Sequence, residues 1–488
     1  MTAPGKTSVR SSLLWASLGQ IGFFILQFGS SVIVARLLSP RETGIFALGA
    51  AAVGLVSVVQ ALGLNNYLIQ VERPEKAVLA TVFTINFLLS CLLSVAIIGL
   101  GAIGNRIFHD PGPGRVMLWL AATPLIGAIG LVPTSQLQRE GDFRGLSLLR
   151  IWGTTAGTLL TVALAFAGFS YMSLAYGWVL TCAVNALCAC ALRPKYVRFA
   201  LGFRGWREVS SFGLQMVVIN GATQIQRQLL NLTMGRILGV DAVGLFSRAN
   251  SVTNLLYENL QTIAARVFLV DFANTVRAGE PLSDRYGKVV ECMTALLWPL
   301  FAGLAVLSQP AVRLIYGAKW TGSAWPLSLL CVSSMLWISV AMAWEIFIIG
   351  KETARQSRLE VARAAFGTTL WILACFGGLD LAAASRIVES ALVVYLYWPH
   401  IARITKIPSR ALRGAYLRSA VLTAAAIAPA TVLMMYFSWS PMVPLGLMVS
   451  SIGLGIGAYA ALLFSMDHPL RDEVTGLMRV WRKNRLSN

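Results

Sequence analysis

A stripe of polar side chains runs along one apolar segment near the middle of the chain. Asn220, Gln224, Arg227 and Asn231 follow one another at intervals of four, three and four residues, which places them on one face of a helix. A guanidinium group binds a phosphate through two parallel hydrogen bonds, and amides hydrogen-bond hydroxyl groups such as those of sugars. The spacing therefore predicts a polar lining that would hold an anionic or hydroxyl-rich ligand.

The next apolar segment carries a second polar stripe. Asn254 and Glu258 lie at helical spacing, with Arg248 nearer one end and Arg266 nearer the other. The arginines of the two segments outnumber this acid, and an excess of fixed positive charge in a hydrated cavity favours an anionic substrate. The alternative is that Arg227 and Glu258, which lie at similar depth, neutralise each other as a buried structural pair.

Further polar residues lie inside other apolar segments. Gln20 and Gln27 are seven residues apart on one face of the first segment, where they would add amides to the lining. Hydrogen bonding between helices is the alternative role for each of these amides. Glu258 and Glu345 are the candidates for ion coupling, because Glu345 has no basic residue close to it along its segment.

No other constellation of residues points to catalysis. Arg386 and Glu389 are three apart on one predicted helix and are expected to pair. The seven cysteines and three histidines show no spacing typical of a metal site or an acid/base relay. The sequence therefore predicts neither an enzyme nor a metal or other cofactor.

The segments that position these side chains are those of a membrane protein. Hydrophobic residues make up 56% of the 488 residues and charged residues only 12%, which a water-soluble surface would not tolerate. A helix that spans a bilayer needs about 20 mostly apolar residues. Such runs predict an all-α polytopic membrane protein of about 14 transmembrane helices, at residues 11–35, 43–69, 77–104, 115–138, 147–168, 172–192, 209–238, 243–270, 287–308, 325–349, 361–379, 381–399, 417–437 and 441–465.

Charge predicts the orientation. The formal net charge is +19, yet the basic residues lie mainly in short loops, so they indicate topology and not nucleic-acid binding. Assigning alternate loops to opposite sides places 29 of the 40 Lys and Arg on one side and 7 on the other, with 4 inside the spans. Because cytoplasmic loops are the basic ones, both termini are predicted to be cytoplasmic, with residues 309–324 forming the longest outward loop.

An internal repeat organises the spans. Residues 35–46 (ARLLSPRETGIF) align without a gap with residues 235–246 (GRILGVDAVGLF), an offset of 200 that pairs Gly44 with Gly244. Six predicted helices precede the second copy, so both copies begin on the same side. The predicted domains are an N-lobe at 1–200, a C-lobe at 201–410, two further helices at 411–466 and a basic cytoplasmic tail at 467–488. Paired lobes of this kind are typical of transporters, with the substrate path between them.

Several strings carry a family resemblance. VARLLSPRETGIFALG at 34–49, GLFSRANSVTNL at 244–255 and PAVRLIYGAKWTGSAWPLSLL at 310–330 resemble the Wzx-like polysaccharide transporter flippases of the MOP exporter superfamily. The resemblance covers most of the chain in order. It implies two six-helix lobes plus two C-terminal helices, in a multi-pass protein of the bacterial cytoplasmic membrane.

The resemblance also implies a function. The substrate would be an undecaprenyl-pyrophosphate-linked oligosaccharide, such as an O-antigen or exopolysaccharide repeat unit, flipped by alternating access. Partners would be this lipid-linked oligosaccharide, membrane lipids and the polysaccharide polymerase or export machinery. The resemblance itself implies only a cationic lumen. The depth of the side chains in the spans assigns Arg227, Arg248 and Arg266 to the pyrophosphate, and the polar stripes assign Gln20, Gln27, Asn220, Gln224, Asn231 and Asn254 to the saccharide path. The alternatives are a MATE-like multidrug or cation antiporter, which would need net acidic groups in its cavity, and a lipid II flippase.

Overall fold

The computed structural model describes residues 22, 24–58, 60, 64–70, 75–108, 110–197, 200–277, 281–466, 468–471 and 475, and these residues form helices and turns with no strand among them. A helix over 24–37 comes first. The helices that follow are α2 (Pro40–Ser57), α3 (Leu64–Gln70), α4 (Lys76–Phe108), α5 (Pro111–Leu120), α6 (Ala122–Arg139), α7 (Phe143–Phe166), α8 (Met172–Leu192), η2 (Pro194–Tyr196), α9 (Trp206–Ile237), α10 (Val240–Arg277), α11 (Leu282–Val306), α12 (Ser308–Tyr316), η3 (Ala318–Ser323), α13 (Ala324–Ser339), α14 (Ala343–Ile349), α15 (Thr353–Cys375), α16 (Leu379–Thr405), α17 (Ser409–Tyr436) and α18 (Leu445–Ser465).

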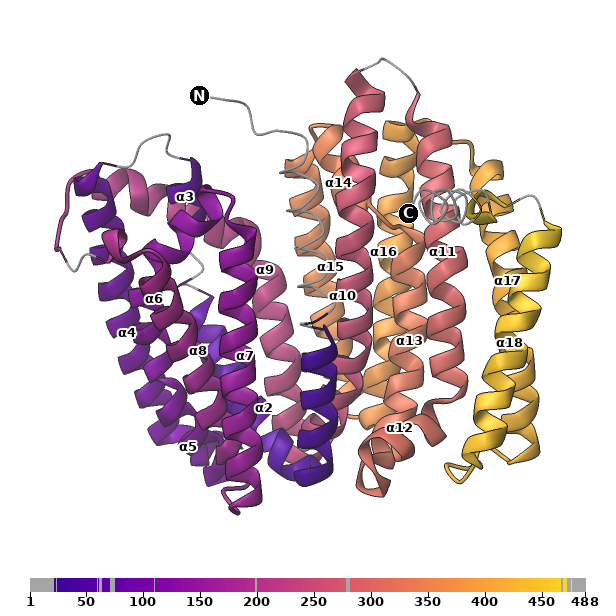
Figure 1. Cartoon of the computed structure of the whole chain (residues 1–488), viewed down its shortest axis with the longest axis horizontal. Helices are drawn as coiled ribbons and strands as arrows, with labels where there is room; N and C mark the ends of the chain where they lie inside the picture. Colours follow the sequence, from indigo (N-terminus) through magenta and orange to yellow (C-terminus); the bar gives the residue numbers. More distant parts are fainter. Residues whose placement is uncertain are drawn as a thin grey trace, which may run out of the picture. The chain divides into compact units, whose positions relative to one another are not determined.

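The chain divides into two compact units, residues 1–247 and 248–488, with the boundary inside α10. In the first unit α7 packs along α8 and α4 along α5, while α6 contacts both α4 and α8 (Figure 1). An apolar cluster joins α3, α4, α6 and α9, and it includes the buried side chains of Leu68, Val82, Val132 and Val209. Hydrophobic contact between these helices therefore holds the first bundle together.

The second unit is a separate bundle of helices. Here α11 packs on α13 and α17, α16 packs on α13 and α15, and α17 packs on α18. The hairpin of α17 and α18, drawn in yellow in Figure 1, is joined to the rest by two apolar clusters. Leu307 packs with Met434 and Met448 in one cluster, and Ala295 packs with Leu422 in the other. This unit carries Arg248, Glu345 and the charged network of α15 and α16 described below.

The helices confirm an all-α membrane protein. Among the described residues, eight helical spans are long and apolar enough to cross a membrane. The long helices α9, α10, α15 and α16 do not reach that apolar composition, because polar and charged residues interrupt them. Charged residues within a multi-pass membrane protein face protein or water in almost all cases. These four helices are therefore the best candidates to carry a substrate-binding site.

Three of the predicted spans consist of two helices each. The span predicted over 43–69 consists of α2 and α3, the span over 115–138 of α5 and α6, and the span over 325–349 of α13 and α14. Between α13 and α14 the backbone of Met342 adopts a left-handed conformation with φ of 61°. The carbonyl of Ser339, which the break removes from the helical ladder, accepts a hydrogen bond from the Tyr416 hydroxyl of α17 at 2.5 Å. A neighbouring helix thus satisfies the interrupted backbone, as a nonpolar environment requires.

The longest predicted loop is also ordered. Residues 309–324 form most of α12 and all of η3, which turn at Gly317 with φ of 99°. Trp320 and Tyr316 are buried at 0% and 3% exposure. The segment is therefore a small packed structure and not an open loop.

The two copies of the sequence repeat meet each other directly. Gly44 lies on α2 against the backbone carbonyl of Val240, and Gly244 lies on α10 against the backbone carbonyl of Pro40. A Cβ atom at either glycine would collide with that carbonyl, so the crossing requires glycine at both positions. Equivalent residues of the repeat therefore make equivalent contacts, as an internal symmetry requires.

Candidate functional site

The predicted polar stripe of α9 lies on a helix throughout. Gln224 and Arg227 are exposed and Asn231 is partly buried, while Asn220 is helical in its backbone and its side chain lies outside the described part. The exposed guanidinium of Arg227 occupies the middle of a helix of 32 residues. α9 thus presents a cation and an amide for contact with a ligand.

Arg248 of α10 has the best-defined surroundings of the predicted arginines. Arg248 is only 7% exposed. The guanidinium carbon lies 5.0 Å from the ring centroid of Trp320 and 5.3 Å from that of Tyr316. Stacking of this kind uses the faces of the guanidinium, whereas hydrogen bonds to an anion use its edge. Arg248 therefore joins α10 to the segment formed by α12 and η3.

The remaining predicted residues are less closely surrounded. Asn254 and Glu258 are exposed on α10, and Gln27 is exposed on the helix over 24–37. Gln20 and the side chain of Arg266 lie outside the described residues. Their assignment to a substrate site stays a prediction.

Glu345 differs from these residues because it is buried. It lies on α14, the seven-residue helix that follows the break, and is 8% exposed. Its Oε2 atom makes no hydrogen bond to any described residue. An unsatisfied carboxylate oxygen inside protein is unusual enough to need an explanation.

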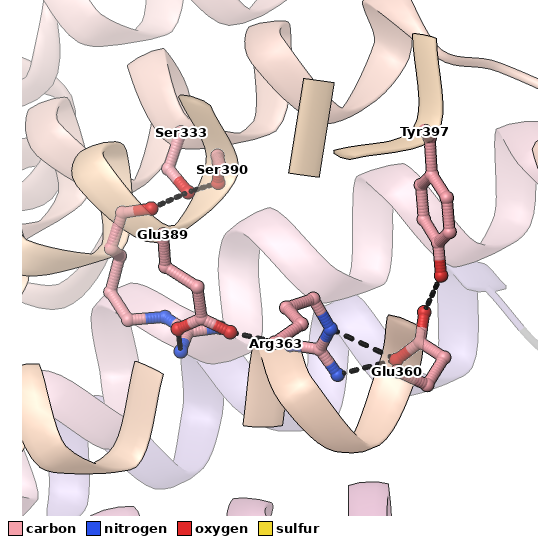
Figure 2. A network of polar contacts seen from close by, with 7 residues as sticks. Ser333, Glu360, Arg363, Glu389, Ser390 and Tyr397 are labelled. Atoms are coloured by element: carbon pink, nitrogen blue, oxygen red, sulfur yellow. Dashed lines mark hydrogen bonds and ion pairs between the residues drawn. The ribbon is translucent and has the colours of Figure 1, made fainter. Parts of the chain in front are cut away.

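A charged network lies where α15 and α16 pack together (Figure 2). Arg363 of α15 is at its centre: its Nε donates to Oε2 of Glu360 at 2.9 Å, and its Nη1 donates to Glu389 of α16. Tyr397 donates its hydroxyl hydrogen to the other oxygen of Glu360. Arg363 and Glu389 are 6% and 1% exposed, so each buried charge depends on the other.

The network also reaches α13. Arg386 donates to Glu389, which confirms the predicted pair. The hydroxyls of Ser333 on α13 and Ser390 on α16 are hydrogen-bonded at 2.7 Å, and Ser333 donates to the backbone carbonyl of Arg386 at 3.2 Å (Figure 2). Two arginines therefore balance two glutamates, and the network ties three helices together instead of offering an excess of charge to a ligand.

Sequence reasoning found only half of this network. The predicted helix began at residue 361, so Glu360 fell outside it and Arg363 was counted with the adjoining loop. The helix in fact begins at Thr353. The spacing of three residues between Glu360 and Arg363 repeats that between Arg386 and Glu389, and this repeated spacing was the signal available in the sequence.

The described residues offer chemistry for binding and not for metal coordination. No group of three or more His, Cys, Asp or Glu that could hold a metal ion occurs among them. They provide the exposed Arg227 and several amides on polar helices. The charges of the α15–α16 network, by contrast, neutralise one another. Arginine and amide side chains suit an anionic, hydrogen-bonding ligand.

Known proteins resemble this chain in sequence. The chain is 26% identical over 341 residues to the succinoglycan biosynthesis transport protein ExoT of Rhizobium meliloti (strain 1021), which covers 68% of this chain and 67% of that protein. It is 23% identical over 328 residues to the lipopolysaccharide biosynthesis protein WzxC of Escherichia coli (strain K12), covering 67% of each.

A solved structure shares the fold. The lipid II flippase MurJ, in an inward closed conformation, aligns with a TM-score of 0.76 at 13% sequence identity, over 92% of this chain and 98% of MurJ. The profile of the family described as "Polysaccharide biosynthesis protein" matches residues 33–325, which is more than half of the chain. The chain therefore belongs to this polysaccharide biosynthesis protein family.

Proposed function

We propose that this chain is a flippase that moves an undecaprenyl-pyrophosphate-linked oligosaccharide from the cytoplasmic to the outer leaflet of the bacterial cytoplasmic membrane. The observation that carries the proposal is the family match over residues 33–325 in a chain that shares its fold with the lipid II flippase MurJ. The name of ExoT as a transport protein for succinoglycan biosynthesis supports the same class of cargo. Transport by alternating access of two lobes fits the repeat that the sequence contains.

The proposed roles of the arginines differ with their surroundings. Arg227 is exposed on α9 and is the first choice for the pyrophosphate. Arg248 would reach the anion with the edge of a guanidinium that lies over the rings of Trp320 and Tyr316. Arg266 is assigned to the pyrophosphate only because of its predicted depth in α10.

The saccharide would be bound by amides. Gln224 and Asn254 are exposed on α9 and α10, and Asn231 is partly buried on α9. Amide groups both donate and accept hydrogen bonds, which suits hydroxyl-rich rings. Gln20, Gln27 and Asn220 complete the proposed lining, and the saccharide product would pass to the polymerase or export machinery outside the membrane.

A substitution at Arg227 tests the proposal. In a strain that lacks the native gene, Arg227→Ala should reduce surface polysaccharide by at least about tenfold, because loss of a charge-assisted hydrogen bond of roughly 1.5–3 kcal/mol weakens pyrophosphate binding. Arg227→Lys should give an intermediate level, since it keeps the charge and loses the bidentate geometry. Extraction of the lipid fraction should show the lipid-linked oligosaccharide accumulating.

Arg207→Ala provides the matched control. Arg207 lies on the same helix and stacks over Trp206 at 5.7 Å, so its loss should leave export unchanged. If the Arg227→Ala variant is made and inserted normally and still exports polysaccharide at the wild-type level, Arg227 does not bind the substrate. An unchanged polysaccharide level in the deletion strain would reject the function itself.

A further inference from the structure

Three glutamates are buried in the described part of the second unit, and two of them have basic partners. Glu389 binds both Arg363 and Arg386. Glu291 of α11 accepts a hydrogen bond from Nε of Arg418 at 2.5 Å. These carboxylates are 1% and 5% exposed, and each contacts at least one guanidinium group.

The third buried carboxylate, that of Glu345, has no such partner in the part of the chain that the structure describes. None of the ion pairs formed by the described residues includes it. Its Oε2 atom is fully enclosed and accepts no hydrogen bond from a described residue. Tyr257 of α10 is the titratable group that acts on it electrostatically, and a phenol carries no positive charge to offset an ionised acid.

Several charged and titratable groups lie on the helices packed against α14. Glu352, just before α15, binds Arg355 of α15 and Arg403 of α16. Tyr397 and His400 of α16 contact the ring of Phe347. No ion pair formed by the described residues therefore gives Glu345 a compensating cation.

A buried carboxylate without a cation is costly when ionised and tolerable when it carries a proton. Backbone carbonyls alone can hold Na⁺, and an imposed Na⁺ gradient tests for that ion. A Ca²⁺ ion is a poor alternative occupant, because it needs several oxygen ligands at once, carboxylates among them. The described residues contain no cluster of acids or histidines around Glu345 that would supply them. The proton is the one ligand that a single carboxyl group binds alone.

Glu345 also lies at a place where the fold is interrupted. It is the third residue of α14, directly after the left-handed Met342 and the carbonyl of Ser339 that Tyr416 satisfies. In transporters, interrupted helices at membrane depth line cavities and adjoin the sites of coupling ions. A change of charge on Glu345 would act close to a backbone segment that single turns hold, such as the bond from the Ala343 amide to the Val340 carbonyl, in place of a continuous helix.

We propose that Glu345 is a proton-binding site through which a proton gradient drives translocation. The carboxylate takes up one proton to become the neutral acid in the buried position, and it releases that proton when the break between α13 and α14 admits water. This proposal rests on the proposed flippase function. It assigns the coupling ion to a single residue and leaves the Arg363 network with a structural role.

The transport experiment uses the purified chain in liposomes with a fluorescent undecaprenyl-pyrophosphate disaccharide as the probe. An imposed pH gradient should accelerate probe translocation by the wild type severalfold, and a Na⁺ gradient at constant pH should have no effect. Glu345→Gln, which mimics the protonated acid, should translocate at the same rate with or without the pH gradient. Asp380→Asn, at an exposed position in the first turn of α16, should respond like the wild type.

The outcomes are separable. A pH-gradient response in Glu345→Gln equal to that of the wild type, a wild type indifferent to the pH gradient, or a wild type driven by Na⁺ would each overturn the proton site while leaving a flippase. A wild type that moves no probe under any gradient would contradict the proposed function instead.

A second measurement needs neither a variant nor transport. An apolar carbodiimide reacts with protonated carboxyl groups in apolar surroundings, so treatment of the wild-type protein followed by peptide mass mapping should modify Glu345 and leave the ion-paired Glu389 unmodified. The degree of modification should fall as the pH rises. Modification of Glu389 without Glu345 would overturn the proposal.

Discussion

Gly367 on α15 leaves the space that the Glu389 carboxylate occupies. A Cβ atom at this position would collide with the carboxyl group of Glu389, which is held by Arg363 and Arg386 and is not able to move away freely. A single methyl group should therefore disturb two buried ion pairs. This makes Gly367 a test of how rigid the network is.

We expect Gly367→Ala to destabilise the purified protein by about 1–3 kcal/mol, the usual cost of forcing an extra methyl group into a packed interior. Thermal unfolding in detergent would measure it as a lower transition temperature. Gly303→Ala is the control, because a Cβ atom at Gly303 meets no atom within 4 Å; there the better helix propensity of alanine should give no loss of stability. Equal transition temperatures for the two variants would show that Glu389 has room to shift.

At the residue scale, local spacing limited what could be predicted. Arg386 and Glu389 were predicted to pair because both lie on one helix at the right interval. The contact between Arg363 and Glu389 joins residues 26 apart in the sequence, and only the packing of α15 on α16 brings them together. The stacking of Arg248 on Trp320 is of the same kind, since hydropathy assigned residue 320 to a loop.

At the element scale, hydropathy located the helices but not their interruptions. The window that identifies an apolar span averages over about 20 residues, so a break of three residues between α13 and α14 leaves the average high. The reason for that break is tertiary, because Tyr416 comes from α17 to satisfy the carbonyl of Ser339. A sequence pattern that describes one segment at a time contains no information about such a partner.

The end of α18 illustrates an element held by one titratable side chain. His468 follows α18, is 2% exposed and accepts a hydrogen bond from the Leu470 amide through Nδ1 at 3.1 Å. Its Nε2 lies 3.5 Å from Oε1 of Glu291 on α11. Burial lowers the pKa of His468 from its usual value of 6.5; the Glu291 carboxylate opposes this shift and the Arg418 guanidinium reinforces it.

This lowered pKa predicts a pH-dependent attachment of the segment after α18. The attached form binds fewer protons than the released form, so attachment is fully favourable above about pH 6.5 and weakens as the pH falls below that value, by at most about 1.4 kcal/mol per pH unit. Hydrogen exchange of the peptide around residues 462–471, corrected for the intrinsic effect of pH, should therefore accelerate between pH 7.5 and 5.5.

His468→Gln should remove that pH dependence, because the amide does not titrate in this range and still offers an acceptor to the Leu470 amide. His400→Gln, on α16 against Phe347, should keep it. Exchange that stays unchanged in the wild type across this range would mean that His468 does not control the attachment.

At the scale of the whole molecule, the class of fold was the easiest property to predict. A hydrophobic content of 56% requires a nonpolar solvent, and most of the described residues in the predicted spans are helical. The repeat was detectable because Gly44 and Gly244 have no tolerated replacement where each meets a backbone carbonyl of the other copy. The predicted lobe boundaries near residues 200 and 410 and the orientation of the termini stay predictions, since neither follows from the packing within a unit.

The orientation can be measured at the two ends of one span. Lys319 of η3 and Lys351, between α14 and α15, are both exposed and lie at opposite ends of the span Ala318–Ile349. In a variant without the seven native cysteines, Lys319→Cys should react with a membrane-impermeant maleimide added to spheroplasts. Lys351→Cys should react only after the membrane is permeabilised, because the segment that follows it is rich in arginine and such segments stay in the cytoplasm.

Labelling at the two positions distinguishes a wrong number of spans from a wrong orientation of the chain in the membrane. Labelling of both from the same side would mean that α13 and α14 do not complete a crossing, which would contradict the reading of this broken pair as one span. The reverse pattern would keep the span but place the basic loops outside, against the charge asymmetry. The expected pattern, combined with an even number of spans, places both termini in the cytoplasm. It also places the segment formed by α12 and η3, together with Arg248, on the outer side of the membrane. That is the side to which the proposed flippase would deliver the lipid-linked saccharide.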